Sequence, residues 1–371
     1  MKIEYLEIKN YKQFTDLKLD LTYPKGHEKE GEPLDKICII GQSGTGKTNL
    51  LEIIRDKLHT TEVKTVFIED ENSNSEKVYF SSVEKSSKKE ITANYNSNII
   101  ELNENSWKLL EETIENYDTK RLKYRDRLSN KLLNIQDYSK EDFKNEIKEW
   151  ESKNENILEN ISDKLNSILI RFNLKLHKID KNQTTYNDLT IEDLSNGNII
   201  EYNHLSTGTK NLIATFIPLK IHNPQDSIIL IDEPENSFYP DIQRELTDLY
   251  INVGENNQLI MATHSPLIAS SFEPWEVVEL KFDKNNQIYR ELYYKGENHV
   301  DNYTLDPRML TWTSILVDIF DLKEDSFSLR EKKLMEYGVL KAEIKDMEKG
   351  ETRDEKIKTF KKLSALLGLQ N

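Results

Sequence analysis

The sequence predicts an α/β fold, with a mixed sheet around a phosphate-binding loop, a helical insertion and a helical C-terminal tail. Three observations predict this fold. A Gly-rich loop joins an apolar run to a helical segment within residues 37–54. A second apolar run, 227–231, ends in two acidic residues, and a third, 258–263, ends in a histidine. Residues 106–172 and 307–371 carry charged patterns with helical periodicity.

The phosphate-binding loop is the most specific motif in the chain. It follows the pattern G-x-x-x-x-G-K-[ST], as Gly41-Gln42-Ser43-Gly44-Thr45-Gly46-Lys47-Thr48. The apolar runs 37–40 and 50–54 are the strand and the helix that should flank such a loop, which argues against a Gly-rich turn with a chance lysine. Backbone N–H groups of the loop and the helix N-terminus can bind phosphate oxygens. We expect Lys47 to reach the terminal phosphates and Thr48 to place its hydroxyl on Mg²⁺.

Length and composition limit the class of protein. A chain of 371 residues fits one large domain or two moderate ones. Its 36% hydrophobic and 32% charged residues, with no run of membrane-spanning length, are typical of a soluble protein. The single cysteine, Cys38, and a start without a signal peptide predict a cytoplasmic protein. The net charge of −15 argues against a generally basic nucleic-acid-binding protein, but a local basic groove or contact with DNA through a partner stays open.

The segment 1–105 is expected to form the N-terminal lobe of the sheet domain. Strands are predicted at residues 2–9, 15–22, 63–70 and 77–83, and polar loops at 24–33 and 84–98. The segment 172–300 is expected to form the C-terminal lobe. Its predicted elements are strand-like alternation within 172–203, a helix from Asp241 to Val253, and strands at 276–282 and 287–294.

The segment 106–171 is expected to be a helical insertion. Apolar residues at alternating steps of three and four mark its second half, at Phe143, Ile147, Trp150, Ile157, Ile161 and Ile168. Ser139-Lys140-Glu141-Asp142 resembles a capping box that opens this helix. Two helices of about thirty residues, each roughly 45 Å long, fit the span. A helical hairpin or short antiparallel coiled coil and a compact helical lobe fit the pattern equally well.

The segment 301–371 is expected to be a helical tail. Capping boxes are predicted to begin at Ser328 and Thr352, and helices to end at Gly350 and Gly368. An apolar stripe is expected to pack the tail on the body or on another subunit, through Leu334, Tyr337, Leu340, Ile344 and Met347.

The second apolar run ends in two carboxylates that can take part in the chemistry. Its sequence is Ser227-Ile228-Ile229-Leu230-Ile231-Asp232-Glu233-Pro234. At the end of a parallel strand Asp232 can hold the Mg²⁺ shell opposite Thr48, through water, and Glu233 is suited to be a general base. An ordinary strand with an acidic turn is the alternative, which the phosphate-binding loop makes less attractive. His264, at the end of the third run, is placed to contact the γ-phosphate, although a lone histidine at a strand end is more often structural.

A fourth motif is Leu205-Ser206-Thr207-Gly208-Thr209-Lys210, which precedes the apolar-rich run 211–216. Alone, it predicts only a helix capped by a serine. A serine hydroxyl, a glycine backbone and the N–H groups of a helix N-terminus also make an anion site.

Taken together, these motifs resemble the ABC-type ATPase superfamily, in its RecF/SMC/OLD-like branch. The resemblance implies an ABC-type P-loop NTPase head over about residues 1–83 and 172–294, with ATP as substrate and Mg²⁺ as cofactor. It implies that Asp232 is the Mg²⁺-associated aspartate, Glu233 the catalytic glutamate and His264 the switch histidine. It also implies that the signature, Leu205-Ser206-Thr207-Gly208-Thr209, acts in trans on ATP held by a partner subunit. The signature departs from the commonest Ser-Gly-Gly form but keeps Gly208, where the backbone must approach phosphate.

Other parts of the family pattern are matched less closely. Asn236 and Ser237 fall in the D-loop region, and Phe238-Tyr239-Pro240 follows where this branch usually has Leu-His-Pro. The segment 8–14 resembles the family's N-terminal motif, in which a basic residue, here Lys12, can touch phosphate. The region after residue 68 offers no convincing Q-loop glutamine.

The resemblance also limits the function. The stretch between the phosphate-binding loop and Leu205 is too short for the arms of SMC proteins, and no D-x-D cluster of a Toprim nuclease follows Ser271. The signature and the helical tail resemble stand-alone ATPases of the Septu, PARIS and retron-associated antiphage systems. This implies a homodimer or higher homo-oligomer and a separately encoded effector, often a nuclease, without a membrane. A RecF-like DNA-repair ATPase is the alternative; Glu233 and His264 together argue against a scaffold that binds ATP without hydrolysis.

Overall fold

The computed structural model describes the chain except for a few short segments and three longer ones. The residues outside the description are 58–59, 69–76, 83–98, 103–105, 136–137, 155–161, 164, 168, 177–190, 323–327 and 370–371. The chain divides into two compact units, Met1–Leu310 and Thr311–Asn371. The predicted loop at 84–98 and the predicted stripe residues Ile157, Ile161 and Ile168 lie outside the described residues.

A seven-stranded mixed sheet forms the centre of the first unit, in the order β13-β12-β3-β11-β10-β5-β6. Its strands are β3 (Lys36–Gly41), β5 (Val78–Ser81), β6 (Ile99–Glu101), β10 (Ile228–Asp232), β11 (Gln258–Ala262), β12 (Val277–Phe282) and β13 (Ile288–Glu291). Only β12 and β13 pair antiparallel; the other neighbouring pairs are parallel. The carboxyl ends of β3, β11, β10 and β5 therefore meet at one edge. The predicted α/β class with a mixed sheet is confirmed.

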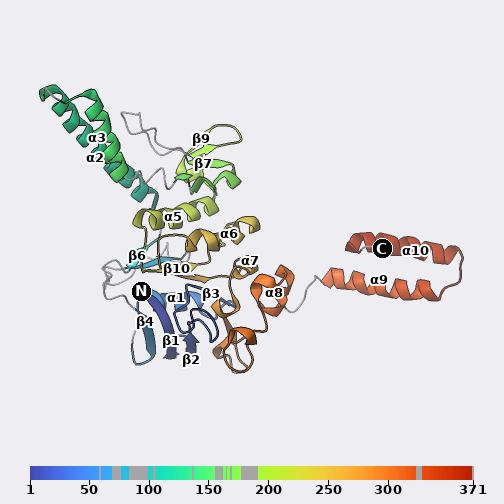
Figure 1. Cartoon of the computed structure of the whole chain (residues 1–371). Coiled ribbons are helices and arrows are strands. Elements are labelled where there is room, and N and C mark those ends of the chain that lie inside the picture. Colours follow the sequence, from blue (N-terminus) through green and yellow to red (C-terminus); the bar gives the residue numbers. More distant parts are fainter. Residues whose placement is uncertain are drawn as a thin grey trace. The chain divides into compact units, whose positions relative to one another are not determined.

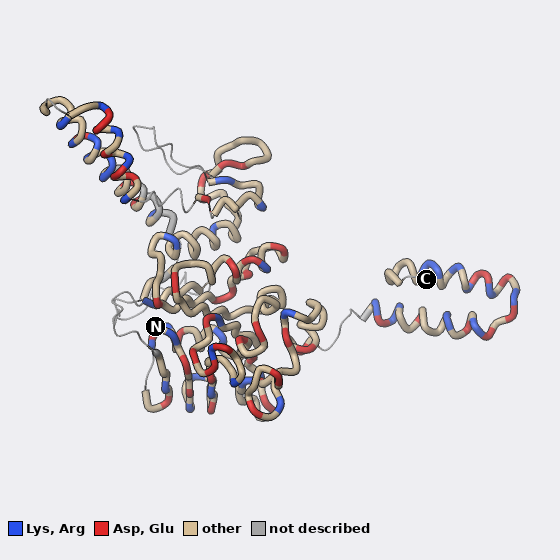
Figure 2. Tube along the Cα trace, viewed as in Figure 1, with Lys and Arg blue, Asp and Glu red and all other residues tan. Residues whose placement is uncertain are grey.

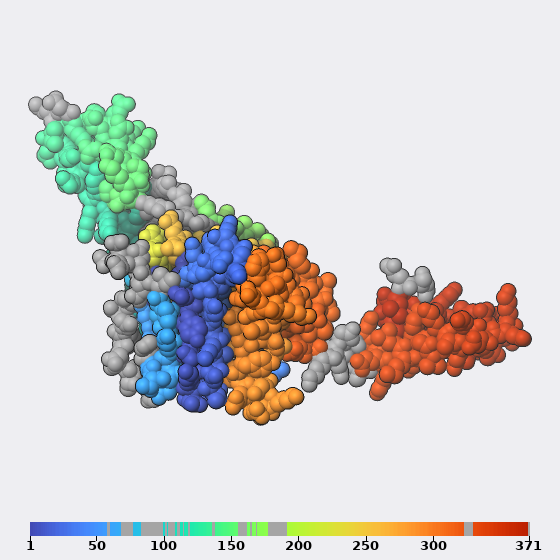
Figure 3. Space-filling view, turned by 60° about the horizontal axis from the view of Figure 1, so that its bottom comes forward, coloured from blue at the N-terminus to red at the C-terminus, as the bar shows by residue number. Residues whose placement is uncertain are grey.

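A three-stranded antiparallel sheet, in the order β2-β1-β4, lies on one side of the central sheet. Its strands are β1 (Lys2–Tyr11), β2 (Phe14–Asp20) and β4 (Val63–Ile68). Helix α1 (Lys47–Arg55) lies between the two sheets, and its apolar residues are buried in their common core (Figure 1). On the outer face β2 lies beside β13, so the small sheet also touches the edge of the large one (Figure 3).

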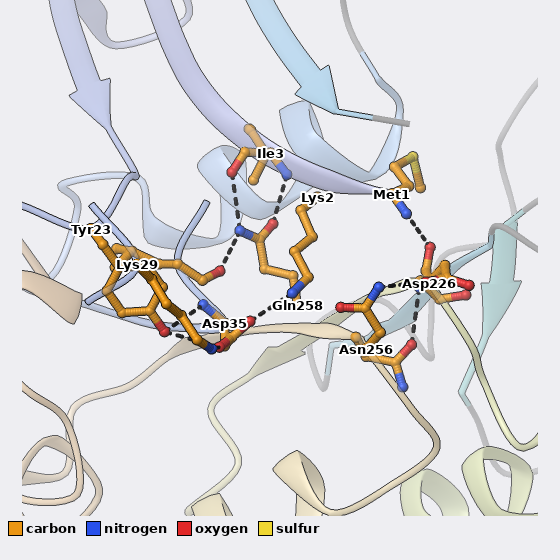
Figure 4. Close-up of polar contacts among 12 residues, drawn as sticks. Met1, Lys2, Ile3, Tyr23, Lys29, Asp35, Asp226, Asn256 and Gln258 are labelled. Carbon is orange, nitrogen blue, oxygen red and sulfur yellow. Dashed lines mark hydrogen bonds and ion pairs between the residues drawn. The ribbon is translucent and has the colours of Figure 1, made fainter. Parts of the chain in front are cut away.

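Polar bonds join the two sheets at the edge where β3 and β11 begin (Figure 4). The Gln258 amide accepts from the Ile3 N–H at 2.8 Å and donates to the Ile3 and Leu34 carbonyls at 3.0 and 2.8 Å. Asp35 accepts from Lys2 at 2.6 Å, from Lys29 at 2.5 Å and from the Tyr23 hydroxyl. Although burial opposes it, this arrangement lowers the pKa of Asp35 to about 2.

Helices cover the other face of the central sheet, opposite α1 (Figure 1). They are α5 (Thr207–His222), α6 (Pro240–Ile251) and α7 (Pro266–Ala269). A small sheet lies beyond α5, farther from the central sheet, and its strands are β7 (Leu174–Leu176), β8 (Ile191–Asp193) and β9 (Ile199–Ile200). Short 3₁₀ turns occupy Ile170–Phe172, Tyr202–His204, Pro274–Glu276, Val300–Asn302 and Pro307–Met309.

The insertion contains a helical hairpin of α2 (Ser106–Asn134) and α3 (Lys140–Lys153). Ion pairs join the two helices, from Arg121 to Glu151 at 2.9 Å and from Lys131 to Glu146 at 3.1 Å. Charges of both signs alternate along them (Figure 2). The predicted capping box is confirmed, since Ser139 and Asp142 bond each other's backbone N–H. The described part of the second helix is shorter than expected.

The second unit contains α8 (Trp312–Asp318), α9 (Ser328–Asp346) and α10 (Glu351–Leu367). The predicted apolar stripe of α9 packs on α10, with the rings of Tyr337 and Phe360 stacked at 4.5 Å. Gly368 ends α10 in the left-handed conformation, as predicted. The capping box predicted at Thr352 is wrong, because α10 already begins at Glu351 with Gly350 as its N-cap. No helix in the described part of the chain has the length and apolarity needed to cross a membrane.

Candidate functional site

The phosphate-binding loop connects β3 to α1, as the sequence predicts. Gly41 and Gly46 have positive φ of 149° and 84°, and a Cβ would collide with the Leu280 carbonyl at the first and with the Gln13 side chain at the second. Lys47 donates to the Gly41 carbonyl at 3.0 Å. Its burial lowers the pKa of Lys47, while the carboxylates of Asp232, Glu233 and Glu235 act in the opposite direction.

The hydroxyl of Thr48 and the carboxylate of Asp232 meet across the edge of the sheet, with Oγ1 2.8 Å from Oδ2. The same carboxylate oxygen accepts from Ser82 Oγ at 3.1 Å, at the end of β5. Hydroxyl and carboxylate oxygens are the hard ligands that Mg²⁺ prefers, and this ion usually keeps waters and substrate phosphates as further ligands. The residues present therefore fit Mg²⁺ bound together with a nucleotide, although the described residues contain no cluster of three or more His, Cys, Asp or Glu.

Glu233 follows β10 directly and has a positive φ of 50°, which is uncommon for a residue with a side chain. Its N–H donates to the Ala262 carbonyl at 2.8 Å, so the end of β11 holds this backbone in place. Conformations of this kind cost about 1–3 kcal/mol and cluster at functional sites. The strain at Glu233 lies where the sequence predicts a catalytic carboxylate.

His264 lies at the end of β11, and its N–H donates to Glu235 Oε1 at 2.6 Å. Burial lowers the pKa of the His264 imidazole, and the nearby Lys47 ammonium lowers it further, against the opposite effect of Glu233. The imidazole is therefore neutral at pH 7. The charges of Lys47 and Glu233 both act on the His264 imidazole, and the roles of these three residues around one phosphate chain stay a prediction.

The signature segment begins α5, where Ser206 is the N-cap and accepts from the Thr209 N–H at 3.2 Å. Gly208 packs on the backbone of Ser237, in the D-loop region, so closely that a Cβ would collide with the Ser237 carbonyl oxygen. Within the described residues, no hydrogen bond joins Leu205–Thr209 to the phosphate-binding loop. The signature is therefore supported from its own subunit without reaching that subunit's loop.

The turn between β1 and β2 lies over the start of α1. Lys12 has a positive φ of 51° and donates to Asn49 at 2.8 Å and to Glu52 at 2.9 Å. Its ammonium is thus bonded to helix side chains on α1, one turn beyond the loop. Gln13 lies closer to the loop than Lys12, because it packs on Gly46 and accepts from Asn49 at 3.0 Å.

A family of known proteins matches this part of the chain. The sequence profile described as "AAA domain, putative AbiEii toxin, Type IV TA system" matches residues 36–270, which is more than half of the chain. The chain belongs to this AAA-domain family. The phosphate-binding loop and the Asp-Glu strand that characterise its nucleotide site lie at one edge of the sheet. No match was found among the curated proteins.

Solved structures with remote similarity include two SMC heads. One, "Crystal structure of the SmcHead bound to the C-winged helix domain of ScpA", is 13% identical, with a TM-score of 0.42 over 78% of this chain and 97% of that one. The other, "SMC head domain from Thermotoga maritima", is 11% identical, with a TM-score of 0.40 over 79% and 99%. The fold assignment rests on the sheet order and the phosphate-binding loop, because these likenesses are distant.

Three residues of the site were missed from the sequence. Ser82 directly follows β5, within the strand that the sequence predicts at 77–83, and the end of that strand is the only signal for its place near Asp232. Gln13 adjoins Lys12 in the N-terminal motif but carries no charge that would single it out. Glu235 follows the Asp-Glu pair by two residues, where an acidic turn residue usually faces solvent.

Proposed function

We propose that this protein is an ABC-type ATPase and a dimerising, Mg²⁺-dependent ATP switch that controls a separately encoded effector, a nuclease, in antiphage defence. The observation that carries the ATPase part is the 2.8 Å bond between Thr48 and Asp232, with Glu233 and His264 at the adjacent strand ends. The signature's resemblance to antiphage ATPases supports the defence role. The family's description, which names a toxin of a toxin–antitoxin system, agrees with a function that depends on a partner protein.

The residues divide the chemistry of ATP hydrolysis among them. N–H groups of the loop and the Lys47 ammonium hold the phosphates. Bound Mg²⁺ neutralises charge that develops on the phosphate oxygens, and Thr48, Asp232 and Ser82 are the residues that would hold it, directly or through water. Glu233 accepts the proton of the attacking water. His264, at the end of β11, contacts the γ-phosphate as a hydrogen-bond donor.

The signature completes the site from a second subunit in this proposal. Ser206 and the N–H groups at the start of α5 form an anion site that makes no contact with the loop of the same subunit. A two-fold dimer places each signature on the nucleotide of the other subunit, so each dimer has two composite sites. ATP then joins the subunits and hydrolysis releases them.

A RecF-like DNA-loading ATPase is the second candidate, and one observation favours it. Lys120, Lys123 and Arg127 project from α2 at steps of three and four, are exposed, and form no ion pair with a described residue. A row of unpaired cations suits a phosphate backbone. DNA that stimulates hydrolysis several-fold, with loss of this effect in Lys123→Gln, would favour this candidate over defence.

Mixing two inactive variants tests the composite site. Lys47→Ala should lose ATP binding, and Ser206→Arg should bind ATP but not hydrolyse it, because an arginine blocks closure on the partner. An equal mixture should recover about a quarter of wild-type turnover, since half the dimers are mixed and each has one complete site. A mixture without activity, despite subunit exchange shown by fluorescence transfer, contradicts the trans arrangement. Wild-type turnover by Lys47→Ala alone contradicts the site itself.

A further inference from the structure

We propose that Glu235 is a positioning residue: it fixes His264 against the nucleotide, and a hydrogen-bond chain joins it to the backbone that supports the signature. The inference rests on the proposed function, because it concerns turnover at that site. It adds a residue outside the motifs, and it links a subunit's own nucleotide site to the signature that this subunit offers to its partner.

Glu235 bonds both residues at the end of β11. Its Oε1 accepts from the His264 N–H at 2.6 Å, and its Oε2 accepts from the Thr263 hydroxyl at 2.7 Å. Both bonds are short, as expected when the acceptor is ionised. The carboxylate therefore ties the loop after β10, which carries Glu233, to the backbone of His264. Their relative position depends on this bridge and on the bond from the Glu233 N–H to the Ala262 carbonyl.

The Glu235 carboxylate also carries a charge that acts on the lysine of the phosphate-binding loop. Its hydrogen-bond partners are the Thr263 hydroxyl and the His264 N–H, and no ion pair joins it to a lysine or arginine in the part of the chain that the structure describes. Its charge instead acts on Lys47, whose pKa it raises along with Asp232 and Glu233.

The chain of bonds continues away from the nucleotide. Thr263 Oγ1 also accepts from the Ser265 N–H at 2.9 Å, and the Ser265 hydroxyl donates to Gln243 Oε1 at 2.6 Å. Gln243 lies on α6 and donates from Nε2 to the Phe238 carbonyl at 2.9 Å. Phe238 follows Ser237, whose carbonyl touches Gly208 of the signature. A shift of His264 when the phosphate chain changes can therefore move the support of Gly208.

Comparing Glu235→Ala with Glu235→Gln separates the effect of the hydrogen bonds on turnover from the effect of the charge. Alanine removes both acceptors, and we expect kcat to fall by roughly 10²-fold with mant-ATP affinity unchanged, as for a group misplaced by about 1 Å. Glutamine can still accept from His264 and bond Thr263, so it should restore kcat to within roughly fivefold of wild type. Asp248→Ala, an exposed acidic residue on the same α6 as Gln243, is the matched control and should turn over like wild type.

Substitutions of Thr263 and Gln243 test the remaining hydrogen bonds between Glu235 and the signature. Thr263→Val removes the hydroxyl at constant shape and should lower kcat at least about tenfold, whereas Thr263→Ser should not. Gln243→Leu removes only the bonds to Ser265 and Phe238, which are farthest from the nucleotide, so the affinity for mant-ATP should not change. ATP-dependent dimerisation of Gln243→Leu, measured in a Glu233→Gln background, should weaken by about tenfold.

The outcomes separate this inference from the proposed function. If the wild-type protein shows no ATP turnover, the proposed function fails. If wild type turns over and Glu235→Ala does too, the positioning role fails alone. A parallel loss of kcat, mant-ATP affinity and thermal stability in Glu235→Ala, unrescued by glutamine, also overturns it, because that pattern belongs to a merely structural residue. Unchanged dimerisation of Gln243→Leu rejects the link to the signature.

Discussion

The nucleotide site and the α9–α10 hairpin are held together by different kinds of contact. In the site, Thr48 bonds Asp232, and Ser82 bonds the same carboxylate, although these residues are far apart in the sequence. In the hairpin, Lys356 pairs with Glu343 and Tyr337 stacks on Phe360, which all lie within one short stretch. The site therefore exists only when the whole sheet has formed, whereas the hairpin needs only its own two helices. Changes in the first region should alter chemistry or core stability, and changes in the second should alter neither.

Glu233→Gln should give the largest effect and sharpen this contrast. The amide keeps the shape of the side chain but cannot accept the proton of the attacking water, so turnover should fall by about 10²- to 10⁴-fold. ATP binding should remain, and the subunits should stay closed on ATP. Size-exclusion chromatography with ATP and Mg²⁺ should show a larger species than without ATP. An unchanged elution position would count against dimerisation through the heads, and unchanged turnover against the role of Glu233.

Glu276→Gln should affect stability in a pH-dependent way, because the core buries this carboxyl at the start of β12. Burial raises the pKa of Glu276 to about 7, against the weaker opposite effect of Lys36. Between the unfolded pKa and this value the folded state binds an extra proton, so stability falls as pH rises. The glutamine variant has no such titrating group, so its free energy of unfolding should not fall in this way as pH rises. Between pH 4.5 and pH 8 its free energy of unfolding relative to that of wild type should increase by on the order of 3 kcal/mol.

Thermal or urea unfolding of both proteins at several pH values measures this difference. The Glu273 N–H donates to Glu276 Oε2 at 2.6 Å, and the amide oxygen of glutamine can still accept it. Glu297→Gln, an exposed residue paired only with exposed Lys25, is the control and should show no such slope. A constant difference between wild type and Glu276→Gln across the pH range would mean that Glu276 is ionised in the folded core.

The motif-bearing parts of the fold could be predicted because each motif also marks a strand end. The apolar runs before Gly41, Asp232 and His264 became the adjacent parallel strands β3, β10 and β11, with β11 between the other two. Since parallel strands end at one edge, the predicted meeting of Thr48 with Asp232 is confirmed. The roles assigned to these residues and to the signature stay predictions.

Other features depend on contacts that no local pattern encodes. Ser82 and Glu235 are ordinary polar residues until the sheet brings them to Asp232 and His264. The capping box predicted at Thr352 is wrong for the opposite reason. The sequence pattern is present, but α10 already begins at Glu351, with Gly350 as its N-cap. The stripe around Tyr337 is visible in the sequence, but it packs on α10 of the same hairpin, whereas the prediction was the body or another subunit, because periodicity alone does not identify its partner.

A truncated chain that ends at residue 323 tests the role of the α9–α10 hairpin. Of the changes considered, it should have the smallest effect on ATP binding and on the stability of the first unit. It lacks α9 and α10, whose contacts with each other are lost together. We expect unchanged ATP affinity and a thermal midpoint within roughly 2 °C of wild type, because no residue of the buried cluster around the two sheets is removed. The face of α9 opposite α10 exposes Met335 and Val339, at 72% and 57% of their surface. Exposed apolar residues at a helical spacing favour a docking surface.

The truncated chain should therefore lose higher assembly or the effector while it keeps hydrolysis. Light scattering with ATP measures the first, and co-purification with the product of an adjacent nuclease gene measures the second. Met335→Lys with Val339→Lys is the finer variant, since it leaves the Tyr337–Phe360 contact intact and changes only the exposed face. Lys358→Gln with Lys362→Gln, on exposed positions of α10, is the matched control. If the truncated chain is insoluble or loses ATP binding together with its thermal stability, the tail serves to cover the ATPase core, and the docking role is wrong.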